Sequence, residues 1–71
     1  MQTLTERESF VLYLLCKGLK NEEIADELSI SVHTVKAHLE SIYEKLNVTN
    51  RVQASIKSIK LGLIDIERVL V

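Results

Sequence analysis

Apolar residues recur along this chain at intervals of three and four, the spacing that places side chains on one face of an α-helix. The clearest run is Val35, Leu39, Ile42 and Leu46. β-Branched residues follow the same helical spacing and do not alternate as they would in a strand. The pattern therefore predicts an all-α fold.

Capping residues divide the chain into four helices. Thr5 followed by Glu8 has the spacing of a capping box, and Ser31 and Asn50 are N-cap residue types that precede later apolar runs. Glycines follow the first and the last of these helices, where a left-handed residue commonly ends a helix. We predict helices over residues 6–17, 21–28, 32–46 and 51–61.

The order of the two middle helices indicates a helix-turn-helix unit. A short helix, the turn Ser29–Ser31 and a longer helix follow one another. Ala25 is small enough for the two helices to approach closely, and Ile30 in the turn can fill the space between them. By spacing alone, helical hairpins of unrelated function fit equally well.

The apolar runs also predict which side chains form the core. Phe10, Tyr13 and Leu14 are expected to point away from the core on the first helix. The expected core residues are Leu12, Leu15, Ile24, Leu28, Val35, Leu39, Ile42 and Leu46.

Composition narrows the class of protein. The 71 residues, with two glycines and no proline, suit one small helical domain over residues 1–71. A single cysteine excludes an internal disulfide, and there is neither a membrane-spanning apolar run nor a signal peptide, so a cytoplasmic protein without membrane contact is expected. The net charge of -1 argues mildly against nucleic-acid binding, because nucleic-acid-binding domains are typically basic.

No constellation of residues indicates an enzyme, a cofactor or a metal. Cys16, His33 and His38 do not have metal-site spacing, because the two histidines are five residues apart on one helix and do not share a face. No base is placed beside Cys16 to activate it as a nucleophile. We expect no catalytic residues.

Several segments together resemble the LuxR-type (GerE/NarL-like) domain, over residues 4–64. The resemblance implies a four-helix domain that binds double-stranded DNA as a dimer, with the third helix in the major groove and the fourth at the dimer contact. Many related domains lie at the C-terminus of response regulators or signal receptors. An excised domain that lacks its receiver or sensor domain is therefore favoured over a stand-alone regulator. The segments are Leu4–Glu8, Asn21–Ala25, Thr34–His38, Lys45–Val48 and Asn50–Ala54.

Two positions depart from the family pattern. Lys20 stands where the family often has Ser or Thr, so Asn21 is expected to cap the second helix. Glu40 stands where some relatives carry Lys, which argues against strong non-specific affinity for DNA.

The third helix supplies the candidate base-reading residues. Its face opposite the apolar run is polar, and recognition helices contact bases through their N-terminal residues. Lys36 can donate to guanine, Ala37 can pack on a thymine methyl, and Glu40 can accept from cytosine. With His33 these form the predicted set, although a solvated helix face would look the same.

Phosphate contacts are expected from Thr34, at the start of the third helix, and from three cations, Lys20, Lys45 and Arg51. A high density of cations on one face can offset an overall negative charge.

Two alternatives to a LuxR-type DNA-binding domain remain open. One is a helical protein-interaction module without DNA contact, and the other is a fragment that resembles the last domain of a sigma factor.

Residues on the fourth helix predict a weak homodimer. Ile56 and Ile59 are three residues apart and share a face, and Ser55 is small enough for close approach. Alternatively, the two isoleucines complete the core under the first helix.

Overall fold

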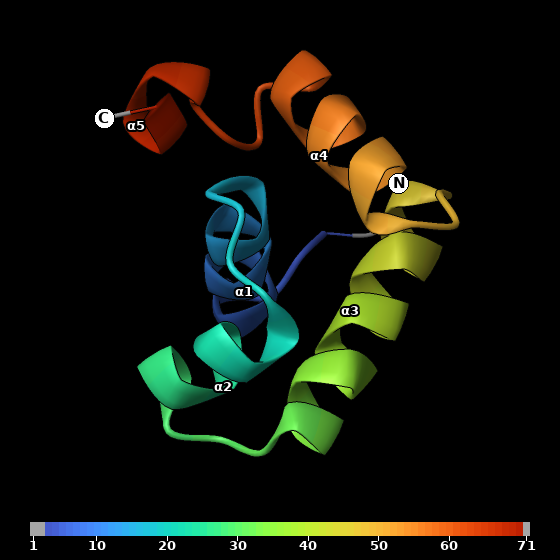
Figure 1. The fold of residues 1–71 in the computed structure, drawn as a ribbon. Coiled ribbons are helices and arrows are strands. Elements are labelled where there is room, and N and C mark those ends of the chain that lie inside the picture. The colour runs from blue at the N-terminus through green and yellow to red at the C-terminus, as the bar shows by residue number, and fades with distance from the viewer. Residues whose placement is uncertain (1–2, 71) are drawn as a thin grey trace.

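The computed structural model describes residues 3–70, and every regular element among them is an α-helix (Figure 1). The all-α fold predicted from the apolar spacing is confirmed. The order is α1 (Glu6–Cys16), α2 (Asn21–Leu28), α3 (Val32–Leu46), α4 (Arg51–Lys60) and α5 (Ile66–Leu70).

Helix α1 begins and ends at local signals in the sequence. The Thr5 hydroxyl accepts from the Glu8 amide at 3.1 Å, and the Glu8 carboxylate accepts from the Thr5 amide at 2.9 Å, which completes the capping box. At the other end Gly18 takes a φ of +92°, and the Leu19 amide turns back to the carbonyl of Leu14 at 3.2 Å. This Schellman arrangement satisfies carbonyls that the helix leaves free.

Helices α2 and α3 form the helix-turn-helix unit. Ser29 ends α2 in the left-handed conformation, with φ 55°, and the Ile30 amide donates to the Ala25 carbonyl at 3.0 Å. The Ser31 hydroxyl then accepts from the Thr34 amide at 3.0 Å and caps α3. The turn is therefore held by a backbone hydrogen bond at the end of α2 and by a side-chain cap at the start of α3.

The start of α2 differs from the prediction. Asn21 is the first residue of the helix, and Lys20 is the N-cap. A lysine side chain has no hydrogen-bond acceptor, so Lys20 cannot cap the helix through its side chain. Of the two bonds of a capping box, the one present is that in which the Glu23 carboxylate accepts from the Lys20 amide at 2.7 Å.

The core lies between α1, α2, α3 and α4, and α3 contacts each of the other three (Figure 1). Two expectations about it were wrong. Leu14, expected to face outward, is 5% exposed, because α1 is covered by other helices on more than one side. Leu28, expected in the core, is only half-buried at its edge. The buried apolar residues are Val11, Leu12, Leu14, Leu15, Ile24, Ala25, Val35, Leu39, Ile42, Leu46, Ala54 and Ile64.

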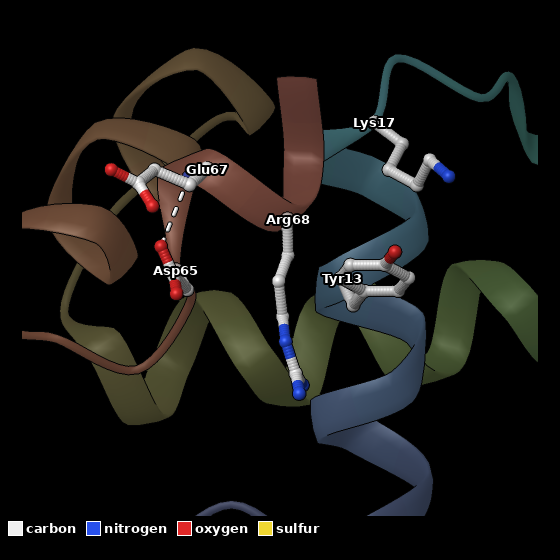
Figure 2. A pocket seen from close by; sticks show the side chains of 5 residues that line it. All are labelled: Tyr13, Lys17, Asp65, Glu67 and Arg68. Atoms are coloured by element: carbon white, nitrogen blue, oxygen red, sulfur yellow. Dashed lines mark hydrogen bonds between the residues drawn. The ribbon is translucent and has the colours of Figure 1, made fainter. Parts of the chain in front are cut away.

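Helix α5 is an element that the apolar pattern did not predict. Ile64 is buried just before it, and the Asp65 carboxylate accepts from the Glu67 amide at 3.0 Å at its first turn. Figure 2 shows α5 beside α1, with Arg68 and Tyr13 lining the open hollow between the two helices. With only five residues, α5 was too short to show a helical period.

Shortening one buried side chain of α3 tests this core. We expect Leu39→Ala to lower the free energy of unfolding by about 2–5 kcal/mol, because it removes buried contacts and leaves a cavity. Chemical denaturation followed by circular dichroism measures the loss. A change below about 0.5 kcal/mol, as is usual at surface positions, would contradict the burial of Leu39.

Candidate nucleic-acid interface

The predicted base-reading residues lie on the solvent face of α3. His33, Lys36, Ala37 and Glu40 are all exposed, and their spacing of three and four places them on one side of the helix. The buried stripe of α3 occupies the other side. The helix therefore presents a cation, an anion, an imidazole and a methyl group side by side at its N-terminal half.

The first turn of α3 is fixed by two neighbouring hydroxyls. Ser31 Oγ and Thr34 Oγ1 are hydrogen-bonded at 2.9 Å, in addition to the cap that Ser31 forms with the Thr34 amide. Thr34 is half-buried. Its hydroxyl is thus held at the positive end of the helix dipole, a position that favours an anion.

Two of the predicted phosphate contacts, Lys20 and Arg51, line the same surface hollow. The Arg51 guanidinium donates to the Leu19 carbonyl at 3.4 Å and to the Asn21 amide oxygen at 3.3 Å. These bonds join the start of α4 to the first residue of α2 and to the segment that precedes it. Two exposed cations consequently lie beside the start of the helix-turn-helix unit, although they are far apart in the sequence.

The third predicted phosphate cation, Lys45, is engaged elsewhere. Its ammonium lies 2.7 Å from Glu8 Oε1, and both side chains are largely buried. Lys45 therefore neutralises a carboxylate inside the fold, which leaves its ammonium less available to a DNA phosphate. The sequence did not predict this ion pair, because a contact between residues 37 apart leaves no local pattern.

Glu8 receives three donors. Thr5 and Lys45 donate to its Oε1, and the Ser41 hydroxyl donates to Oε2 at 2.6 Å. Burial by itself would raise the pKa of Glu8, but the hydrogen bonds from Lys45, Ser41 and Thr5 outweigh it and lower the pKa to about 2. The carboxylate is therefore ionised near neutral pH and holds α1 against α3.

The predicted dimer residues of α4 do not share one environment. The side chain of Ile56 is 63% exposed, and that of Val52, one turn earlier, is 64% exposed. Ile59 is half-buried and packs against the core, as the alternative interpretation expected. Ser55 is also half-buried, and its hydroxyl donates to the Arg51 carbonyl at 2.9 Å. The exposed apolar surface of α4 therefore centres on Val52 and Ile56.

The side chains and helices of residues 3–70 also bear on metal binding and on membrane insertion. No group of three or more His, Cys, Asp or Glu side chains in this range could hold a metal ion. No helix in the same range has the length and apolar character required to cross a membrane.

The sequence matches a protein-family model described as bacterial regulatory proteins, luxR family, over residues 2–58. The chain is 53% identical to the nitrate/nitrite response regulator protein NarP of Escherichia coli K12 over 53 residues, which are 75% of this chain and 25% of NarP. It is 44% identical to the response regulator protein VraR of Staphylococcus aureus Mu3 over 64 residues, 90% of this chain and 31% of VraR. This chain thus spans only a quarter to a third of those relatives.

Two solved structures have the same fold. The response regulator ChrA of a heme-sensing two-component system superposes with a TM-score of 0.86 at 44% identity, over 90% of this chain and 32% of ChrA. The transcription factor GerE superposes with a TM-score of 0.81 at 32% identity, over 90% of this chain and 97% of GerE. The resemblance deduced from short sequence segments is confirmed.

The lowered pKa of Glu8 predicts how stability depends on pH. Because the folded state favours the ionised carboxylate, its contribution is complete above the ordinary pKa, near 4.5, and is lost as the pH falls toward about 2. The loss should be on the order of 3 kcal/mol. Denaturant titrations between about pH 6 and 2.5 measure it, and Glu8→Gln should flatten the curve. An unchanged slope in Glu8→Gln would show that other groups cause the acid sensitivity.

Proposed function

Since this chain belongs to the luxR family of bacterial regulatory proteins, we propose that it binds a specific double-stranded DNA site by inserting the N-terminal half of α3 into the major groove. The domain is of the DNA-binding transcription-regulator class, like the matched part of NarP and VraR. The observation that carries the finer proposal is the exposed polar face of α3 opposite its buried stripe.

The four residues of that face have complementary chemistry for base edges. Lys36 can donate to guanine O6 and N7, and Glu40 can accept from the cytosine amino group. Ala37 can contact a thymine methyl, and His33 is placed at the end of the helix that enters the groove first. Together they are suited to read a short mixed sequence rather than a single base type.

Phosphate contacts orient the domain on the duplex and carry the non-specific affinity. We assign them to Lys20, Arg51 and Thr34, which lie near the starts of α2, α4 and α3. Few cations are involved, and Glu40 adds an anion to the groove face. Non-specific binding by one domain is therefore expected to be weak.

The proposal includes a weak homodimer on DNA. Val52 and Ile56 form an exposed apolar surface one turn long on α4, of a kind that usually marks an interface. Such a short surface buries little area. Two domains related by twofold symmetry would occupy a roughly palindromic site, and the second half-site would supply affinity that one domain lacks.

NarP, VraR and ChrA are named as response regulators, and this chain matches a quarter to a third of each. By analogy, we propose that a receiver or sensor domain controls the DNA-binding domain in the whole protein. The proposed activity is binding without catalysis, in the bacterial cytoplasm where the DNA lies.

Removing one base contact tests the recognition helix. On a site selected from random duplexes, Lys36→Ala should weaken binding by about 1–3 kcal/mol with no loss of helix content, because the donor to guanine is lost. Fluorescence anisotropy at fixed salt measures the affinity. As a matched control, Lys17→Ala removes an exposed lysine that follows α1 and lines the hollow beside α5, outside the proposed DNA and dimer surfaces. Equal effects of the two variants would refute base reading by Lys36.

Placing a charge on the exposed surface of α4 tests the dimer. Ile56→Glu should abolish cooperative occupation of two half-sites and leave binding to a single half-site and the thermal melt nearly unchanged, because Ile56 contributes little to the core. Gel-shift titrations on one-site and two-site duplexes measure cooperativity. As a control, Phe10→Glu places the same charge on an exposed residue of α1, and this variant should still occupy the two half-sites cooperatively. Persistent cooperativity in Ile56→Glu would place the interface elsewhere.

A further inference from the structure

The buried Glu8 carboxylate connects the start of α1 to the second half of α3. Its Oε2 accepts from Ser41 Oγ at 2.6 Å, and its Oε1 accepts from Lys45 Nζ at 2.7 Å. Ser41 and Lys45 are four residues apart, so they stand one above the other on the same face of α3. One carboxylate thus contacts α3 at two points along its length.

Apolar packing and these hydrogen bonds constrain α3 in different ways. Burial of the stripe around Leu39 and Ile42 is favourable over a range of small rotations, because the hydrophobic effect is non-directional. Hydrogen bonds weaken steeply as their angles depart from linear. Two such bonds to a single rigid carboxylate therefore define both the rotation of α3 about its axis and its position along that axis.

The carboxylate is itself held in place. Thr5 donates to it at 2.9 Å within the capping box, and Glu8 is 5% exposed. Its ionised form persists down to acidic pH because the hydrogen bonds from Lys45, Ser41 and Thr5 overcome the cost of burial and bring the pKa to about 2. The carboxylate that links α1 to α3 is thus ionised at neutral pH.

Base reading requires this kind of constraint. Side chains that recognise a ligand must be held within about 0.5 Å and 10–20° of the productive geometry. Glu40 precedes Ser41 directly, and Lys36 and Ala37 lie one turn before it on the same helix. A rotation of α3 that is small enough for the core packing to tolerate would shift these three side chains relative to the base edges.

We propose that Glu8 is a positioning residue for DNA recognition, which fixes the rotation of α3 through Ser41 and Lys45 and so sets the sequence specificity of the domain. This inference rests on the proposed function, because it concerns the same face of α3. Since Glu8 is buried, its effect on DNA binding has to pass through α3 rather than through a contact of its own.

Two variants test this role. Ser41→Ala deletes one bond to α3 and leaves the capping box and the ion pair intact. Glu8→Gln keeps a residue that suits the capping box but removes the charge that holds Lys45. Matched controls are Ser9→Ala and Glu6→Gln, which make the same changes at exposed positions of α1 outside the network.

The readout is the ratio of affinity for a selected duplex to affinity for a random duplex of equal length and salt, measured well below the melting temperature. Both test variants should weaken binding to the selected duplex about tenfold and change binding to the random duplex less than about twofold, because phosphate contacts carry the non-specific term. The two controls should keep the wild-type ratio. Circular dichroism reports the folded fraction of each variant.

A ratio that stays at the wild-type value in Ser41→Ala, or affinities for both duplexes that fall together, would overturn the proposal and leave Glu8 a purely structural role. If Glu8→Gln does not fold, Ser41→Ala decides alone. If the wild-type protein itself does not distinguish the selected from the random duplex, the proposed function fails instead, so the two failures are separable.

Discussion

Helix α3 has to serve the core and the candidate DNA surface at the same time, and this constraint sets the rest of the structure. Val35, Leu39, Ile42 and Leu46 follow one another at spacings of four, three and four, and α1, α2 and α4 all pack against α3. Once that stripe is buried, 100° per residue leaves no choice about which side chains face solvent. The position of the candidate base-reading face is therefore a geometric consequence of the core stripe.

The charge balance of the domain follows from the same arrangement. Lys45 and Glu8 neutralise each other inside the fold, so neither contributes to the field at the surface. Lys20, Lys36 and Arg51 remain exposed near the helix-turn-helix unit, and Glu40 opposes them. With so few cations exposed near this unit, the counterion release that drives non-specific binding is expected to be small, so the proposed binding would depend on base contacts and on a second half-site.

Structural features that depend on residues close together in the sequence were predicted correctly. Features that depend on contacts between residues far apart in the sequence were not. The caps of Thr5, Ser31 and Asn50 use partners three residues away, and their hydrogen bonds are those expected. The environments of Leu14 and Lys45 depend on helices that approach from elsewhere in the chain, so the burial of Leu14 and the ion pair of Lys45 were not predicted. The base-reading and phosphate-contact assignments stay predictions, because they concern DNA and not the fold.

Helix α4 shows how a small domain distributes its apolar residues. Its fully buried positions are the small residues Ala54 and Ser58, which allow α4 to approach α1 closely. The Ser58 hydroxyl donates to the Ser55 carbonyl at 2.9 Å, so its burial leaves no unpaired donor. The larger Val52 and Ile56 lie on the opposite, exposed side of the helix, because two residues correspond to a rotation of about 200°. Their exposed surface is small, so the dimer proposed above would form only when DNA already holds both copies close together.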